Sequence, residues 1–238
     1  MFKLISVNIE HDKHIDLVLK FLDEEKPDVL YLQEVFNEDY MMIKDRFSME
    51  GFFESYVLVG SYAGDGILHD SGCALLSKFP LQDIKIEYYY GDADVMPVAG
   101  SIPSDEYPKV LLSAKAEING KKYDLATTQF TWTKDGEATD RQRENAEKLL
   151  TLLKSHKSLI LAGDFNAPRG REIFAEFNKH YRDNIPKEYT TSIDKNIHRA
   201  GGLQLMVDGL FSTEDIEFEN VKLVDGVSDH MAIVAEVK

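Results

Sequence analysis

Short apolar runs separated by polar turn residues recur along the chain and predict a layered α/β protein. Residues 2–9 have high β propensity, and residues 28–34 and 158–161 are apolar runs bounded by turn residues, which is typical of buried strands. Between the first two, apolar residues recur at helical spacing from Ile15 to Leu22. The start of the chain therefore predicts one strand, helix and strand unit.

Four segments in all carry helical signals. The first helix can be capped by Asp12 and is followed by Pro27, and a later helix can be capped by Asp140 at its start. The other two helices are expected at residues 37–49 and 171–177. Their wide spacing leaves most of the chain to strands.

The remaining apolar segments predict strands, many of them joined by short turns. Residues 109–118 and 121–129 flank Asn119-Gly120, a strong signal for a hairpin. The stretch 91–108 holds three prolines and is long enough to be a functional loop. Further strands are expected at 52–60, 72–78, 81–90, 205–211, 216–224 and 231–237. About eleven strands and four helices indicate two packed sheets with helices outside, in a single domain over residues 1–238.

The composition agrees with one soluble domain. With 43% hydrophobic residues among 238, the chain can form one sizeable core. No stretch approaches the ~18–20 apolar residues that span a bilayer, and the opening segment meets the polar residues 10–12 too soon for a signal peptide. Cys73 is the only cysteine, so an internal disulfide and a cysteine-rich metal site are excluded. We expect a cytoplasmic monomer without a membrane span.

The net charge of −15 restricts the class of partner. A protein that holds long duplex DNA through many phosphate contacts usually has a basic face, so strong binding to long duplex is not expected. An acidic protein can still hydrolyse phosphate esters when metal ions supply local positive charge. Part of the acidic excess can therefore be metal ligands, although most of it must be ordinary surface.

Polar side chains with suitable chemistry follow several of the apolar strands. Asn8 and Glu34 close the first two, and a carboxylate directly after Val-Leu-Tyr-Leu is costly to bury without a partner such as a metal. Asp164 and Asn166 follow the strand at 158–161 and can offer an oxygen ligand and an amide donor in the same direction. Each also fits an ordinary structural role, Glu34 at the rim of a sheet and Asp164 with Asn166 in a polar turn.

The order and contexts of these residues resemble the endonuclease/exonuclease/phosphatase superfamily. The motifs that carry the resemblance are Ser6-Val-Asn8, Leu32-Gln-Glu34, Gly72-Cys-Ala-Leu-Leu-Ser-Lys-Phe-Pro80, Gly163-Asp-Phe-Asn166, Val207-Asp208 and Ser228-Asp-His230. They extend over the whole chain, and their agreement in sequence order makes the resemblance specific. The resemblance implies a four-layer α/β sandwich, in which two packed mixed β-sheets are flanked by helices and the site lies at one end.

The resemblance also implies roles for individual residues. Glu34 matches the principal Mg²⁺ ligand, Asn8 its neighbour and Asp229 a further acid of the metal site, and Mn²⁺ is expected to substitute for Mg²⁺. A hard divalent ion held by one or two carboxylates and substrate oxygens is the usual Mg²⁺ arrangement. Such an ion polarises water and stabilises the charge on phosphorus.

The remaining matches concern the reaction itself. Asp164 matches the residue that orients or deprotonates the attacking water, and Asn166 the amide that holds a phosphate oxygen. His230 matches the histidine that contacts the scissile phosphate, and Asp208 its carboxylate partner. A carboxylate beside a histidine favours imidazolium, which is useful next to a phosphate and as an acid.

Gln129 is the one position that departs from the pattern of the superfamily. Most members place a histidine after this strand, whereas this chain has Thr128-Gln129. Glutamine can donate a hydrogen bond to a phosphate oxygen but cannot carry a proton or charge at neutral pH. Loss of one general acid can cost about 10²–10⁴-fold in rate, so a catalytically impaired phosphate-binding protein is one alternative function.

The main hypothesis is a Mg²⁺-dependent phosphodiesterase that cleaves a DNA or RNA end, a lesion or a short single strand. Trp132, the only tryptophan, could stack a base, although a lone tryptophan more often packs in the core or at a rim. A phosphatase or phosphodiesterase of small or lipid phosphates, such as inositol phosphates, is a second alternative. It needs a basic cluster at the mouth of the site, for which the chain offers only Arg169, Arg171, Lys195, His198 and Arg199. Arg141 lies in a first helical turn, where a phosphate partner or plain solvation is possible.

Overall fold

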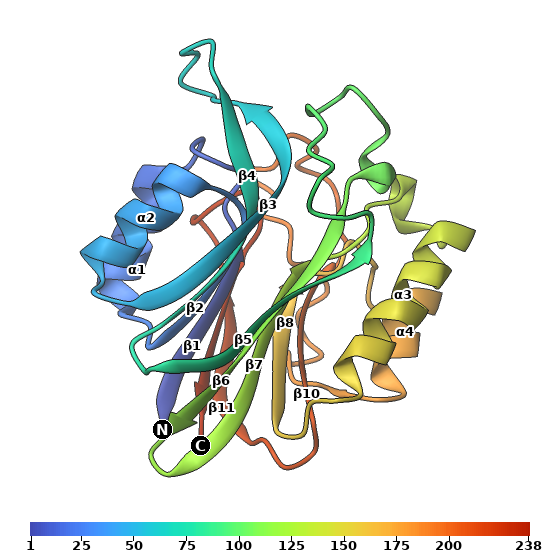
Figure 1. Cartoon of the computed structure of the whole chain (residues 1–238). Helices are drawn as coiled ribbons and strands as arrows, with labels where there is room; N and C mark the ends of the chain where they lie inside the picture. The colour runs from blue at the N-terminus through green and yellow to red at the C-terminus, as the bar shows by residue number, and fades with distance from the viewer.

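The computed structural model describes all residues, 1–238, and contains two six-stranded mixed β-sheets packed face to face (Figure 1). Sheet A consists of β1 (Phe2–Asn8), β2 (Val29–Phe36), β3 (Glu50–Gly60), β4 (Leu68–Ser77), β11 (Phe218–Val224) and β12 (Ala232–Val237). Sheet B consists of β5 (Leu81–Tyr90), β6 (Lys109–Ile118), β7 (Lys121–Gln129), β8 (Leu159–Asp164), β9 (Arg182–Asp183) and β10 (Asp208–Ser212). The strand orders are β11-β12-β1-β2-β4-β3 and β5-β6-β7-β8-β10-β9.

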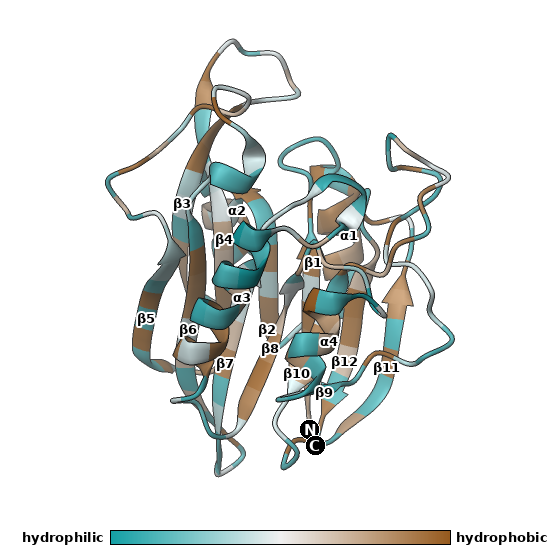
Figure 2. Cartoon of the chain, turned by 90° about the vertical axis from the view of Figure 1, so that its right-hand side faces the viewer, coloured by the Kyte–Doolittle hydropathy of each residue, from teal (hydrophilic) through white to brown (hydrophobic).

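Helices cover the outer face of each sheet. The outer face of sheet A carries α1 (Ile15–Glu25) and α2 (Asn37–Arg46), and that of sheet B carries α3 (Asp140–Leu153) and α4 (Glu172–Asn178) (Figure 1). Two short 3₁₀ turns complete the elements, at Ser104–Glu106 and Lys134–Gly136. Figure 2 shows polar residues concentrated on the helices and apolar residues on the central strands. The predicted four-layer α/β sandwich is confirmed.

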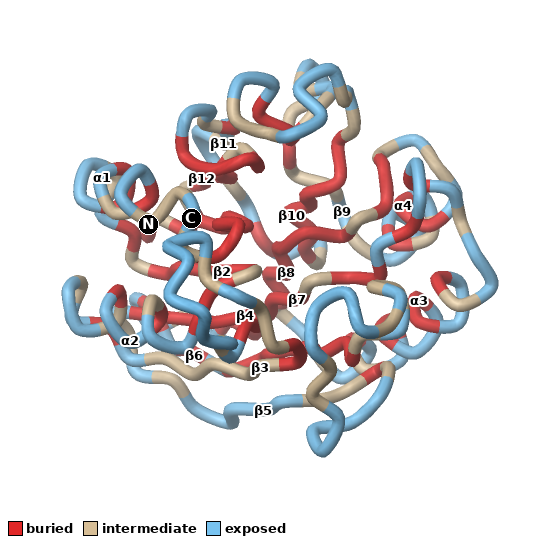
Figure 3. Tube along the Cα trace, turned by 90° about the horizontal axis from the view of Figure 1, so that it is seen from above, coloured by how far each residue is buried: buried red, intermediate tan, exposed pale blue.

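Alternate residues of the central strands face different layers, as the pleat of a strand requires. In β1, Leu4 lies in the core between the sheets, whereas Ile5 packs under the helices of sheet A. In β8, Ile160 faces the core between the sheets, whereas Leu161 faces α3 and α4. The buried part of the chain therefore lies in the middle of the molecule, as Figure 3 shows from above.

Two parallel crossovers bring the ends of four strands to one end of the sandwich. α1 joins the parallel strands β1 and β2, and α3 lies between the parallel strands β7 and β8. Because parallel strands end at the same edge of a sheet, Asn8, Glu34, Gln129 and Asp164 lie at the upper end in Figure 1. The turn between β3 and β4 and the loop 91–108 rise above this end (Figure 1).

Both predicted helix caps are wrong. Asp12 does not cap α1, because its carboxylate accepts hydrogen bonds from the Ser61 hydroxyl and from two backbone N–H groups of the β3–β4 turn. It thereby ties this turn to the end of the sandwich where the polar strand ends meet. α3 is capped by Thr139, whose hydroxyl accepts from a backbone N–H of the first turn, and Asp140 is the first helical residue.

The Asn119-Gly120 hairpin is confirmed, since both residues have positive φ angles of 54° and 80°, as a type I′ turn needs. The segment 180–199 contains the two-residue strand β9, and β10 begins at Asp208. None of the helices has the length and apolar content needed to cross a membrane.

Candidate active site

Because side chains alternate along a strand, four predicted site residues point into the same space between the two sheets. Asn8, Gln129, Asp164 and Asp208 each lie an even number of residues from an inter-sheet core residue of their own strand. Because alternate side chains of a strand share a face, all four point between the two sheets. The strand register also places Asp164 opposite both Gln129 and Asp208.

Glu34 reaches this space through a β-bulge. Leu30 and Leu32 pack under the helices of sheet A, so unbroken alternation would bury Glu34 beneath them as well. The pairing of β2 with β4 is shifted between Gln33 and Val35, and Glu34 has a φ of 49°. A bulge re-aims one side chain, and a left-handed non-glycine residue costs roughly 1–3 kcal/mol. The local strain therefore directs a carboxylate into the site.

Two amide side chains connect the carboxylates of both sheets. Glu34 Oε1 accepts from Asn8 Nδ2 at 2.9 Å and from Gln129 Nε2 at 2.6 Å. Asp164 Oδ2 lies 3.3 Å and 3.5 Å from the same two nitrogens. The Tyr56 hydroxyl donates to Gln129 Oε1, which fixes the amide with its NH₂ toward the carboxylates. Gln129 thus lies inside the site and holds Glu34.

Asp164, Asp208 and His230 form a buried cluster, in which each residue offers one potential ligand atom within 4.8 Å of those of the other two. His230 Nδ1 is 2.8 Å from Asp208 Oδ2. Burial alone would lower the pKa of His230, but the Asp208 carboxylate outweighs it and holds this pKa well above its usual value. Burial raises the pKa of Asp164 to about 7, with help from Asp208 and against the charge of His230. A cationic imidazole therefore stands beside a carboxyl group that exchanges its proton near neutral pH.

Glu34 and Asp229 each present a carboxylate oxygen without a hydrogen bond. His11 Nδ1, a buried nitrogen without a hydrogen-bond partner, lies 3.8 Å from Glu34 Oε2, and the Glu34 side chain is 29% exposed. Asp229 Oδ2 lies 3.9 Å from His198 Nε2. Burial raises the pKa of Asp229, and the charge of Glu34 adds to the rise. A hard cation would relieve this repulsion, so the oxygen donors present fit Mg²⁺.

Two asparagines are held with their amides oriented. Asn8 Oδ1 accepts from the backbone N–H of Glu10 at 3.1 Å, so its NH₂ group faces the carboxylates and its oxygen faces away. Asn166, with a φ of 49°, donates its backbone N–H to Asp164 Oδ1 at 2.8 Å and its side-chain amide to the Phe130 carbonyl at 3.1 Å. Asn8 therefore orients carboxylates, and Asn166 fixes the rotamer of Asp164.

The carboxylates open into a pocket of about 400 Å³. Glu34, Gln129 and Asn166 form the acidic part of its lining, and a second part of the lining is aromatic and basic. The residues of this second part are Tyr56, Tyr62, Tyr107, Lys109, Trp132 and Arg199. A larger hollow of about 660 Å³, between β5 and α3, contains none of these residues and no cluster of catalytic groups. The smaller pocket is therefore the candidate active site.

The structure brings only some of the predicted substrate residues to this pocket. Trp132, 47% exposed, and Arg199 line it, and His198 lies beside Asp229. Arg141 instead stacks on the ring of Tyr90, 4.6 Å from its centroid, outside the pocket.

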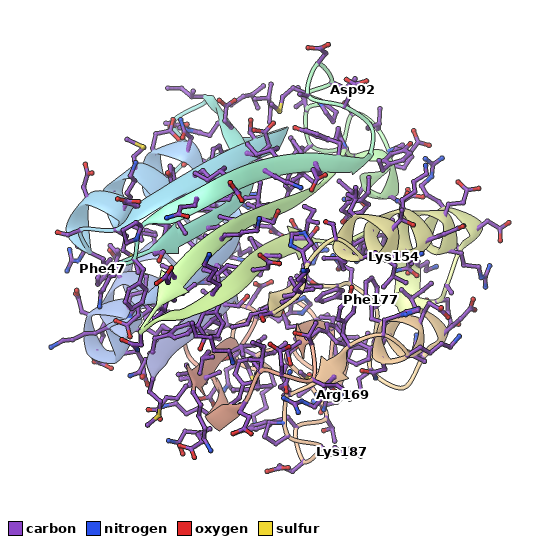
Figure 4. All side chains as sticks on the ribbon, turned by 60° about the horizontal axis from the view of Figure 1, so that its bottom comes forward. Phe47, Asp92, Lys154, Arg169, Phe177 and Lys187 are labelled. Carbon is purple, nitrogen blue, oxygen red and sulfur yellow. The ribbon has the colours of Figure 1, made fainter.

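Arg169 is also absent from the pocket, and its guanidinium is already occupied. It donates to Asp183 at 3.2 Å and to the backbone carbonyls of Ile185 at 3.0 Å and Tyr189 at 3.1 Å. Figure 4 shows Arg169 near Lys187 and far from Asp92 of the loop 91–108. Arg169 therefore anchors the segment that follows β9.

Tyr56, Lys109 and His11 are among the pocket residues that the sequence pattern does not single out. Tyr56 and Lys109 lie in strands whose sequence signals only sheet structure, and His11 follows a strand end without belonging to a motif. His11 and Glu10 both have positive φ angles, 60° and 51°, a strain that sequence alone does not reveal. The proximity of His11 to Asn8 in sequence was the only available signal.

The chain belongs to the endonuclease/exonuclease/phosphatase family, whose model matches residues 5–230. No match was found among curated protein sequences. Solved structures with the same fold include an endonuclease/exonuclease/phosphatase from Bacteroides vulgatus, at 15% identity and a TM-score of 0.74, covering 100% of this chain and 98% of that one. The mannosyl-6-phosphatase Bt3783 of Bacteroides thetaiotaomicron matches at 13% identity and 0.74, with 100% of both chains covered. The catalytic domain of human Nocturnin matches at 18% identity and 0.69, covering 100% and 93%.

Proposed function

We propose that this protein is a Mg²⁺-dependent phosphodiesterase that hydrolyses a nucleic-acid phosphodiester at an end, a lesion or a short single strand. Members of its family act on phosphoesters. The observation that carries the proposal is the buried cluster of Asp164, Asp208 and His230 beside the free oxygen of Glu34. This arrangement supplies a proton acceptor, a cation for a phosphate and hard oxygen donors in one pocket.

Glu34 and Asp229 are the residues that would hold Mg²⁺ or Mn²⁺, and Asn8 orients Glu34. A bound ion supplies positive charge to the phosphate and activates water. Asp164, with a pKa of about 7, accepts the proton of the attacking water. His230 donates through Nε2 to a phosphate oxygen while Asp208 holds Nδ1.

The shape of the pocket supports a substrate end rather than long duplex. A pocket of about 400 Å³ under the loop 91–108 accommodates a group of nucleotide size. Trp132 is exposed at the pocket and offers a face on which a base can stack. The overall charge of −15 disfavours a grip on many backbone phosphates.

A small or lipid phosphate remains the second candidate substrate. A polyphosphate of inositol type calls for several cations, whereas Lys109 and Arg199 are the only lysine and arginine of the pocket. This scarcity favours a substrate with few phosphates. The third candidate, an impaired phosphate-binding protein, rests on Gln129, which joins the site network but cannot transfer a proton.

Hydrolysis of bis(p-nitrophenyl) phosphate and of a short oligonucleotide with Mg²⁺, with Mn²⁺ and with EDTA tests the proposal. Metal-dependent cleavage of both is expected, with EDTA abolishing it. Release of phosphate from phosphomonoesters alone would support the small-phosphate candidate. Oligonucleotide binding without turnover would support the impaired candidate.

A further inference from the structure

Lys109, the first residue of β6, places a buried ammonium group in the pocket without a carboxylate partner. It is 5% exposed, and its only polar contact is the Ser104 carbonyl oxygen at 3.5 Å, the outer limit of a hydrogen bond. Its Nζ lies 5.9 Å and 5.8 Å from the ring centroids of Tyr56 and Tyr107. A buried charge normally has a paired counter-charge, and this one has none.

The neighbours of Lys109 do not replace an anion. Burial holds the pKa of Tyr56 well above its usual value, so its hydroxyl stays neutral. Burial also lowers the pKa of Lys109 to about 8, although Cys73, Asp164 and Glu34 oppose the change. The ammonium form thus persists near neutral pH, and the two rings offer only weak cation–π attraction.

The position of Lys109 links it to the candidate active site. It lines the same pocket as Glu34 and Gln129. The ring of Tyr56 lies beneath its ammonium group, and the Tyr56 hydroxyl donates the hydrogen bond that orients Gln129. Arg199 lines the pocket too, and it forms neither an ion pair nor a side-chain hydrogen bond. Two unpaired cations therefore share one pocket with the groups proposed to attack a phosphodiester.

We propose that Lys109 anchors a second phosphate group of the substrate, next to the phosphodiester that is cleaved. The inference rests on the proposed function and narrows its substrate class to nucleic-acid ends that carry a terminal phosphate. The terminal phosphate completes the ion pair that Lys109 lacks. Arg199 contacts the same phosphate from the more exposed side of the pocket, and the aromatic residues hold the sugar or base between the two phosphates.

The test compares dithymidine monophosphate with the same dinucleotide carrying a further phosphate on its 5′ or on its 3′ end. The wild-type protein with Mg²⁺ is expected to prefer one phosphorylated form by about tenfold or more in kcat/KM. In Lys109→Met, which keeps the length of the side chain, this ratio should fall below about threefold. The two phosphorylated forms distinguish which end of the substrate enters the pocket.

Lys115→Met is the matched control. Lys115 lies on the same strand, is exposed and pairs with Asp83 at 2.6 Å, so its loss should leave the preference unchanged. Thermal unfolding followed by circular dichroism verifies that both variants fold. A wild-type protein with equal kcat/KM for all three dinucleotides, or a preference that survives in Lys109→Met, would overturn the inference.

A binding measurement separates failure of this inference from failure of the proposed function. Calorimetry compares thymidine 3′,5′-bisphosphate with thymidine 5′-monophosphate, in wild type and in Lys109→Met. If no dinucleotide is hydrolysed, the proposed function fails, yet tighter binding of the bisphosphate that depends on Lys109 still supports the subsite. Equal affinity for both nucleotides, or no binding of either, contradicts it.

Discussion

In the acidic part of the pocket Glu34, Asp208 and His230 have hydrogen-bond partners, whereas in the aromatic and basic part the buried cation Lys109 has no charged partner. Asp208 pairs with His230 at 2.8 Å, and Glu34 accepts from two amides. Lys109 has only a distant carbonyl and two rings. The acidic part of the pocket is thus assembled before substrate binds, whereas Lys109 in the aromatic and basic part still lacks a counter-charge. The difference suggests that chemistry and recognition are divided between these two groups of pocket residues.

Removal of the proton acceptor should produce the largest effect. Asp164→Asn keeps the shape of the side chain but cannot accept a proton, so turnover should fall by about 10²–10⁴-fold. Oligonucleotide affinity should change far less, since the positive groups remain. Single-turnover rates beside equilibrium binding would check this, and equal losses in both would assign Asp164 to binding instead.

Neutralising Lys109 should stabilise the folded protein. Lys109 has an ordinary pKa of 10.5 and a folded pKa of about 8, and a lowered lysine pKa means that the folded state disfavours the proton. The penalty, at most about 3 kcal/mol, is complete below about pH 8 and disappears as the pH approaches about 10.5. Lys109→Met should therefore unfold at higher urea than wild type at about pH 7, and the gap should close toward about pH 10.5. A gap independent of pH would mean that Lys109 is not buried as a cation.

Restoring at position 129 the histidine of the superfamily pattern should increase the rate of hydrolysis. Gln129 donates to Glu34 but cannot offset growing charge or transfer a proton. Gln129→His is expected to raise metal-dependent hydrolysis by one or more orders of magnitude, within the ~10²–10⁴ range of a positioned acid or base. Oligonucleotide Kd should move much less. Equal rates would show that Gln129 is already competent and would remove the support for the impaired candidate.

Tyr56 contacts both Gln129 and Lys109, and removal of its hydroxyl should have the smallest effect. Tyr56→Phe removes the hydroxyl that orients the Gln129 amide but keeps the ring under Lys109. Loss of one hydrogen bond predicts a stability decrease of about 1 kcal/mol and a modest fall in turnover. In Gln129→His, Tyr56→Phe should change the free energy of unfolding by a different amount than it does in wild type. A double-mutant cycle in urea unfolding would therefore measure the coupling between residues 56 and 129. Additive effects would contradict the described contact.

Strand alternation explains why much of the candidate site could be predicted. Asn8 and Asp164 end apolar strands and Asp208 begins one, each in the same parity as core residues of that strand, so their direction is contained in the sequence pattern. The orientation of Glu34 is not contained in the sequence pattern. It depends on a bulge and a left-handed backbone conformation that only the β2–β4 pairing reveals. Its assignment came from the family resemblance.

Tertiary context explains the errors. Arg169 looked available, but backbone carbonyls of residues 185 and 189 occupy its guanidinium. Nothing in the sequence marks Lys109 as a buried residue of the pocket, because lysine is rarely buried. Asp12 had the position of a cap, yet the β3–β4 turn competes for its carboxylate. Each outcome depends on contacts between segments far apart in sequence.

Magnesium binding to Glu34→Gln is the most direct test of the account, because Glu34 is the carboxylate that the bulge aims into the pocket. Calorimetry should show Mg²⁺ affinity at least about tenfold weaker than in wild type, since even partners of ligands cost about 10–100-fold. Circular dichroism should be unchanged, and Glu144→Gln, an exposed change on α3, should bind Mg²⁺ as wild type does. Unchanged Mg²⁺ affinity in Glu34→Gln would contradict the assignment of this pocket as a metal-dependent active site.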